Sequence, residues 1–545
     1  MRLGGRIVPV LLLLATVSGH AEAQQARTGS IVDQTLVPHG RVRLQLGGVF
    51  SRWDTRFGRL PDGSEPLEKL GTDLTDPTSL SLYPGMPTLQ NAVRDLTGLT
   101  DFDPILGSTD GRITQDITSI DFGLHVGVFD WLTVGAVLPW VQTRTVIDEY
   151  FAPDTLTGNL GLNPTISNRG GVDAFLNSAS TADVLAAQNA VTMCAGGPSA
   201  ACSDAQALAG RTSTFSSSMA SAYTATPFFP LVGSDAANAL SQEAQQLSAD
   251  LAAAGLSGLA PLALGTDVLT TDGFSRLPTL AGSGIAAAPL QTQKFLYGAG
   301  DLELSARVRL LDNMTPAWST EETYPADRIA AHAAGPWFRY RLTASFLTRL
   351  PTGTNEDPEV LLDVGRSDAQ MDFEGGATAS LEFGRWFGLT AGGRYGVQGS
   401  TTLVKRVAPL ELAMPPVSTQ REVIFDPGFY MVVGVAPIFH ITDGLTLHGE
   451  YRFYHKGRDQ FELVNPDPSL DPTVLEIESG IKQHQAGAGL RYDTVAPWME
   501  GAGGFPLEIH LRLLHTYKGS GGHAPQVTRV EAGLRIFRRI WGPDR

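Results

Sequence analysis

The chain is poor in charged residues, and beyond residue 23 it has no long apolar segment. Asp, Glu, Lys and Arg make up 18% of its 545 residues, below the ~25% usual in soluble proteins, which fits extensive contact with lipid. The formal net charge of −16 leaves no basic face to neutralise phosphates, so wholesale nucleic-acid binding is excluded. Since no later stretch reaches the ~20 apolar residues that span a bilayer, no transmembrane helix is expected.

Cysteine is also scarce. The two cysteines, Cys194 and Cys202, are separated by a segment of Gly, Pro, Ala and Ser. In an oxidising compartment two such residues are expected to form a local disulfide. The alternative is a metal site, which needs four ligands, and no histidine or further cysteine lies near them.

The first 23 residues have the form of a secretory signal peptide. Arg2 and Arg6 supply the positive charge, Ile7–Val17 the apolar core, and Ala21-Glu22-Ala23 a small-x-small cleavage site. A membrane anchor is the alternative, but the apolar run is shorter than the ~20 residues such an anchor needs. We expect an exported chain whose mature form begins near Gln24.

Strict alternation of apolar and polar residues dominates the rest of the chain. Near the C-terminus, Leu507, Ile509, Leu511 and Leu513 alternate with charged or polar residues, and 530–536 repeat the pattern. Period-two alternation predicts β-strands. In a soluble sandwich the apolar face would form the core, whereas in a membrane barrel it meets lipid and the polar face lines a lumen.

We count twelve such segments and predict a twelve-stranded antiparallel transmembrane β-barrel with a long, partly helical extracellular insertion. An even number places both termini at one side, as single-chain bacterial barrels require. Tight turns near Trp131, Trp386 and Gly444, and a set of tryptophans including Trp318, are expected at that side. The expected strands cover 41–53, 117–128, 132–145, 298–310, 337–350, 371–385, 388–404, 428–441, 445–458, 481–495, and the two C-terminal segments that alternate at 507–513 and 530–536.

Four parts follow from this pattern. They are a signal peptide (1–23), the first barrel strands with a long first loop (24–147, the loop at 58–111), an Ala/Ser-rich insertion (148–295) and the remaining strands (296–545). Ala, Leu and Gln recur at helical spacing at 235–254, and 181–190 also favours helix. An insertion this long is not an idle loop, and it could cap the barrel, plug it or lack a single fold.

The polar faces carry many charges, which are candidates for the lumen lining. They could select and guide a solute, or pair with one another across the wall to fill a narrow barrel, and both roles are compatible. His125, His448 and His510 share the predicted inner face, so a metal or acid–base site is conceivable only if three strands align them. The lumen-lining candidates are Arg307, Arg309, Arg339, Arg341, Glu450, Arg452, Glu508, His510 and Arg512.

Three segments, in order, resemble a known family. Gly123–Trp140 (GLHVGVFDWLTVGAVLPW), Gly298–Leu304 (GAGDLEL) and Leu350–Gly353 (LPTG) are similar to the outer-membrane β-barrel family named for the meta-pathway of phenol degradation, a transporter-like group. The resemblance covers the strands and not the insertion. It implies passive transport of small, often aromatic or hydrophobic molecules and carries over no catalytic residue; fold alone does not fix the substrate.

We therefore expect an outer-membrane channel of a Gram-negative-type bacterium, not an enzyme, with membrane lipid and a small solute as partners, no nucleic acid and no cofactor. The oligomeric state stays open. A surface or adhesion module displaying 148–295 is one alternative. Another is an outer-membrane lipase, some of which are twelve-stranded barrels; Ser520 lies near His515 and His523, but a Gly-rich loop accounts for them, and no G-x-S-x-G, H-E-x-x-H or Walker-type motif is present.

Overall fold

The structure is a computed structural model. It describes residues 33, 36–58, 63–76, 82–83, 85–293, 296–314, 337–409, 412–495, 498 and 505–541. The expected signal peptide (1–23) and Trp318 lie outside the described residues.

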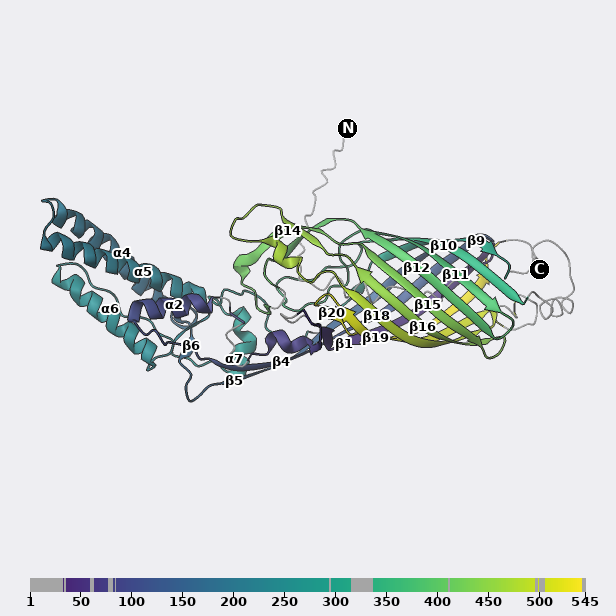
Figure 1. The fold of residues 1–545 in the computed structure, drawn as a ribbon, viewed down its shortest axis with the longest axis horizontal. Helices are drawn as coiled ribbons and strands as arrows, with labels where there is room; N and C mark the ends of the chain where they lie inside the picture. Colours follow the sequence, from purple (N-terminus) through teal and green to yellow (C-terminus); the bar gives the residue numbers. More distant parts are fainter. Residues whose placement is uncertain are drawn as a thin grey trace, which may run out of the picture.

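Twelve antiparallel strands form a closed barrel (Figure 1). The ring order is β4-β1-β21-β19-β18-β16-β15-β12-β11-β10-β9-β5, and β5 pairs with β4 to close it. The predicted fold class is confirmed, since each strand overlaps one predicted segment. The bounds are β1 Arg41–Trp53, β4 Gly107–Phe129, β5 Leu132–Pro153, β9 Leu302–Asp312, β10 Phe338–Leu350, β11 Asp372–Phe383, β12 Phe387–Gln398, β15 Tyr430–His440, β16 Leu445–Lys456, β18 Lys482–Asp493, β19 Leu507–Ser520 and β21 Thr528–Arg539.

The apolar faces of the strands point outward. On β19, Leu511 and Leu513 are each 51% exposed, whereas Glu508 and Arg512 are 1% and 3% exposed. Leaving apolar surface in water costs roughly 25 cal/mol per Å², so a wall of such side chains is stable when hydrocarbon covers it. The barrel is thus apolar outside and polar inside, as a transmembrane barrel requires.

Both described chain ends and the tight hairpins lie at one end of the barrel, which we call the turn end. β1 and β21 start and finish there, since Arg41 pairs with Arg539. The two-to-four-residue turns β4–β5, β11–β12 and β15–β16 belong to the same end. Five tryptophans flank these strand ends, as expected for an aromatic girdle at a membrane interface; they are Trp131, Trp337, Trp386, Trp498 and Trp541.

At the opposite end, the loop end, β4 and β5 continue as a two-stranded ribbon beyond the barrel (Figure 1). They pair from Gly107↔Pro153 to Phe129↔Leu132 and are longer than their alternation predicted. The ribbon leads into a helical region built from both long loops. Its helices are α2 Met86–Thr97, α3 Pro164–Ser167, α4 Arg169–Cys194, α5 Ala200–Ala225, α6 Asp235–Ala253 and α7 Thr271–Arg276, with short helices η1 Leu70–Leu74 and η2 Leu277–Thr279.

One hydrophobic core joins this helical region. Leu89 of α2, Phe215 of α5 and Leu247 of α6 are at most 1% exposed and belong to the same cluster. Packing against the insertion explains why 86–97 is helical although its own composition predicted a loop. α4 and α5 form a hairpin that projects from the molecule, closed by the Cys194–Cys202 disulfide (Figure 1). The insertion therefore forms a helical extension beyond the barrel and does not fill it.

Short strands and loops cover the loop end. β13 Thr401–Arg406, β14 Gln420–Asp426 and β17 Gln460–Leu463 form one sheet; β2 Thr55–Phe57, β3 Leu67–Lys69 and β20 Ala524–Pro525 form a second. The other elements are β6 Leu160–Leu162, β7 Phe228–Pro230, β8 Leu296–Ala299, η3 Val417–Thr419 and η4 Pro472–Leu475. Across the described ranges, none of the helices has the length and apolar character needed to cross a membrane.

Candidate functional site

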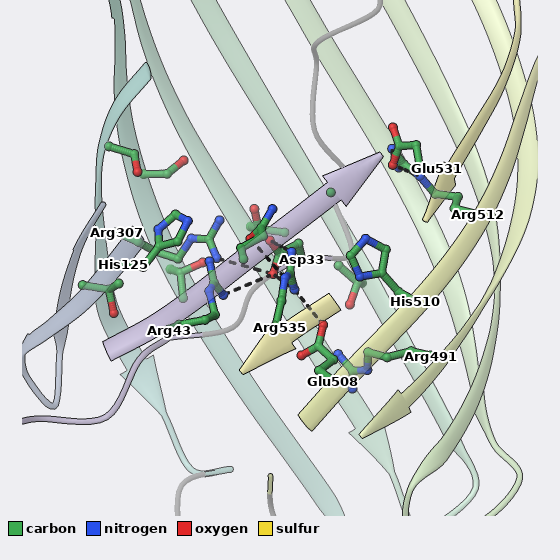
Figure 2. Close-up of a pocket in the computed structure, with 18 of the residues that line it drawn as sticks. Asp33, Arg43, His125, Arg307, Arg491, Glu508, His510, Arg512, Glu531 and Arg535 are labelled. Carbon is green, nitrogen blue, oxygen red and sulfur yellow. Dashed lines mark hydrogen bonds and ion pairs between the residues drawn. The ribbon is translucent and has the colours of Figure 1, made fainter. Parts of the chain in front are cut away.

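The barrel encloses a cavity of about 440 Å³ that is lined mainly by charged and polar side chains (Figure 2). Alternation on each strand directs every second residue into it. Three clusters of ion pairs organise the lining, one around Asp33, one around Arg512 and one around Arg349.

The first cluster centres on Asp33, which precedes β1 in the chain and lies inside the barrel (Figure 2). Its carboxylate is 2.6 Å from Arg535 of β21, 3.9 Å from Arg307 of β9 and 4.0 Å from Arg43 of β1. Arg535 also donates to Glu508 of β19 at 2.7 Å. Three arginines on three strands thus converge on one carboxylate.

The second cluster joins β16, β19 and β21. Arg512 donates to Glu450 at 2.8 Å and to Glu531 at 2.8 Å through Nε. Arg529 contacts the other oxygen of Glu531 at 2.5 Å. All four residues are at most 8% exposed, so each buried charge depends on its ion-pair partners for compensation.

The third cluster lies towards the loop end. Arg349 of β10 contacts Glu303 at 2.8 Å and Asp372 at 3.2 Å, and it donates to the Tyr430 hydroxyl at 2.8 Å. Tyr430 in turn donates to Glu374 at 3.0 Å. This network joins one side of the barrel wall, since its members come from the adjacent strands β9, β10 and β11 and from β15, which is separated from β11 by β12.

A small hydrophobic cluster lies beside Arg349 near the loop end. Phe57 of β2 packs with Tyr430, Val432 and Tyr454 from the inner faces of β15 and β16. The last three are at most 1% exposed. Apolar packing thus lies next to the Arg349 cluster at the loop end, which the sequence pattern did not predict.

At the turn end the charges pair locally. Arg339 of β10 contacts its cross-strand partner Glu382 of β11 at 2.8 Å. Arg309 and Arg341 share Asp312, each at 3.2 Å. These charged residues are thus paired with one another across the wall. Such pairing is one of the two roles considered from the sequence.

The three inward histidines lie on separate strands. A Cβ atom on Gly135 would overlap the ring of His125, and one on Gly533 would overlap that of His510, so each ring occupies space that a neighbouring glycine leaves open. Within the part of the chain that the structure describes, no three His, Cys, Asp or Glu residues lie close enough to hold a metal ion. These histidine rings therefore pack against glycines of neighbouring strands in the barrel wall.

The structure separates the nine lumen-lining candidates into two groups. Arg307, Arg341, Glu508, His510 and Arg512 border the cavity. Arg309, Arg339, Glu450 and Arg452 do not border it, and they lie in the ion-paired or buried parts of the wall.

Several lining residues were missed by the sequence analysis. Arg349 alternates inward on a predicted strand, so the same period-two argument would have found it, and Arg43 lies on the polar face of the strand predicted at 41–53. Asp33 could not be found in this way because it lies in the polar segment before β1, where no alternation assigns a face.

The residues of the lipase alternative are not assembled. His515 Nδ1 contacts the Thr528 hydroxyl at 2.9 Å, and His523 Nδ1 lies 2.6 Å from Glu478. Ser520 is the cross-strand neighbour of Lys482. Among the described contacts, neither histidine hydrogen-bonds to Ser520, so no activated serine is present in this arrangement.

No protein-family model and no curated protein sequence matches the chain. Three solved structures are similar in fold. The COG4313 outer membrane channel from Pseudomonas putida F1 has 8% identity and a TM-score of 0.41, covering 94% of this chain and 100% of that chain. The translocator domain of the autotransporter NalP from Neisseria meningitidis has 8% identity and a TM-score of 0.28, covering 95% of this chain and 96% of that chain. The Pseudomonas putida toluene transporter TodX has 10% identity and a TM-score of 0.24, covering 92% and 90%.

At identities of 8–10% and TM-scores of 0.41 or less, these comparisons assign neither a family nor a substrate to the chain.

Proposed function

We propose that this protein is a passive outer-membrane channel for small molecules. The observation that carries the proposal is the pairing of an apolar outer wall with a charged inner cavity of about 440 Å³ in one closed barrel. The wall suits hydrocarbon, and the cavity suits a hydrated solute. With the turn end in the periplasm, the long loops and the helical region face outward, as in bacterial barrels of this kind.

The lining favours a solute that carries an anionic group. Arg43, Arg307 and Arg535 surround the Asp33 carboxylate, and guanidinium groups bind carboxylates in a matched, bidentate geometry. A solute carboxylate could take the place of Asp33 there, whereas a purely apolar solute would gain no such contact. Small aromatic acids carry a carboxylate that these arginines would bind. They are also aromatic, as the family resemblance implies for the substrate.

Passage requires the hydrophobic cluster around Phe57, which we take to close the loop end, to open. Phe57 belongs to the short strand β2, outside the twelve-stranded ring, so it can leave the lumen without breaking a barrel strand. Tyr430 and Tyr454 belong to the wall itself. Movement of β2 is therefore the lower-cost route by which the cavity would connect to the exterior.

The alternative function is a surface module whose working part is the helical region. The α4–α5 hairpin supports it, since two helices of 26 residues project from the barrel and end in a disulfide. At 1.5 Å per residue each helix is about 39 Å long. A hairpin of this length presents a large surface to the surroundings and has no contact with the lumen.

Solute flux into proteoliposomes separates the two functions. The distal hairpin, residues 180–210, is replaced by a short turn, which leaves the packed base of α4 and α5 in place. If the channel proposal is right, both the wild type and the shortened variant admit a small aromatic carboxylate. Flux in neither form, with a folded barrel in both, would overturn the channel and favour the surface module.

A further inference from the structure

A band of aromatic and histidine side chains crosses the outer wall of the barrel near the loop end. Tyr451 and His484 are joined by a hydrogen bond of 2.8 Å between the phenol oxygen and Nδ1. Both side chains belong to the outward-facing set of their strands. The rim band, as we call it, comprises Tyr395, Phe429, Tyr451, Phe453, His455, His484 and Tyr517.

Ring contacts make the band continuous over neighbouring strands. Ring centroids are 5.5 Å apart for Phe429 and His455, 5.1 Å for Phe453 and His484, and 6.3 Å for His484 and Tyr517. Such contacts stabilise pairs of aromatic rings at these separations. The band is therefore a preorganised surface and not a set of isolated side chains.

Two exposed lysines lie within the rim band. Lys482 of β18 is the cross-strand partner of His455, and Lys518 of β19 is the partner of His484. Neither lysine forms an ion pair with any residue that the structure describes. Because adjacent strands are about 4.8 Å apart, the two ammonium groups can reach one anionic group together.

The surroundings fix the depth of the rim band in the wall. On the same strands, towards the turn end, the outward residues are aliphatic, including Leu490, Leu511 and Leu513, which are 45–51% exposed. Beyond the band the strands pass into the loops of the loop end. Aromatic rings at this height mark the interface between acyl chains and headgroups, so Lys482 and Lys518 lie at headgroup level.

From this arrangement we infer that the rim band and its two lysines bind a phosphorylated glycolipid of the outer leaflet, of the lipid A type. The lysines pair with a phosphate group, the aromatic rings contact the sugar, and the acyl chains lie along the aliphatic wall. The inference uses the outer-membrane localisation and orientation proposed above, but not the passage of a solute through the lumen.

The two lysines and the aromatic rings of the rim band favour this lipid class over an ordinary anionic phospholipid. A phosphate monoester carries up to two negative charges, which matches two lysines better than the single charge of a phosphodiester. The polar edges of His484 and Tyr451 add hydrogen-bonding groups beside the apolar rings, a combination that suits a sugar with hydroxyl groups.

Native mass spectrometry of the full-length barrel in detergent tests the inference, with purified diphosphoryl lipid A as the probe. We expect the wild type to retain lipid A and the K482Q/K518Q variant to bind it at least about tenfold more weakly, since each lysine near an anionic lipid surface strengthens the attraction severalfold. Dephosphorylated lipid A should bind the wild type as weakly as lipid A binds the variant.

The matched control removes two other exposed cations. Lys69 of β3 and Arg169 of α4 have side chains 69% and 72% exposed and lie outside the rim band, so K69Q/R169Q should bind lipid A like the wild type. His484→Gln, which removes one ring of the band, should weaken binding less than the double lysine change. Equal binding by wild type and K482Q/K518Q, or equal binding of phosphatidylglycerol and lipid A, would overturn the inference. Because flux is not measured, this result is independent of the channel proposal.

Discussion

Asp33 and Arg535 form an ion pair inside the barrel, with 2.6 Å between Oδ2 and Nη2, although they are 502 positions apart in the chain. The pair joins the segment before β1 to the last strand. It also places the only carboxylate of that segment that the structure describes among three arginines. The charge balance at this point of the lumen therefore depends on Asp33 together with Glu508, which also pairs with Arg535.

Asp33→Asn should raise the preference of the open channel for anions over cations. The substitution removes one negative charge and leaves Arg43, Arg307 and Arg535 facing the cavity, which raises the positive potential there. The reversal potential under a KCl gradient in planar bilayers measures the change. Asp467→Asn, the same substitution on an external loop, is the control, and a shift of D33N towards cations would contradict the account.

Phe57→Ala should raise single-channel conductance. Truncating a buried Phe costs about 3–5 kcal/mol of local packing, and here it loosens the cluster that closes the loop end of the cavity. Phe373→Ala, on an outward-facing side chain that is 44% exposed, serves as the control and should leave conductance unchanged. Unaltered conductance in F57A would mean that the cluster does not close the path.

Arg512→Met should destabilise the barrel by about 3–5 kcal/mol, because it leaves Glu450 and Glu531 buried without their shared partner. Urea unfolding in lipid vesicles, followed by tryptophan fluorescence, gives the free energy. Arg169→Met on the exposed face of α4 should change it little. Adding Glu450→Gln and Glu531→Gln to R512M should recover part of the loss, and no recovery would argue against charge compensation as the cause.

Lowering the pH should detach the loop after β17 from strand β14. Hydrogen bonds from Ser469 and Arg421 lower the pKa of Asp467 from 3.8 to about 2, and Arg421 Nη2 is 2.7 Å from its carboxylate. Because the folded pKa is the lower one, the contact contributes fully above pH 3.8 and is lost as the pH falls to about 2. Hydrogen exchange at 463–475 should rise over this window in the wild type, and in D467N it should already be high at neutral pH.

Much of the barrel could be predicted because its side-chain period is read directly from the sequence. β1 was predicted with its observed bounds, Arg41–Trp53, since polar and apolar residues alternate without interruption. The outward orientation of Leu511 and Leu513 followed from the same rule. The Cys194–Cys202 disulfide also followed from local spacing.

The remaining features depend on contacts between distant segments. Helix α2 forms where its residues pack against α5 and α6, so its composition alone predicted a loop. Phe57 of β2 packs with Tyr430 and Tyr454, and Asp33 lies among arginines of three strands, so both contacts join segments that are far apart in the chain. Alternation predicts which face a residue occupies, but not which residue from another segment will contact it.

The central claim is that the apolar faces of the strands meet lipid and the polar faces line a wet lumen. Nitroxide scanning of β19 in proteoliposomes tests it most directly, with single spin labels placed from 509 to 513. We predict high accessibility to lipid-soluble oxygen at 509, 511 and 513 and high accessibility to a water-soluble nickel chelate at 510. Low oxygen accessibility at 511 and 513, as for side chains packed in a dry protein core, would contradict the account.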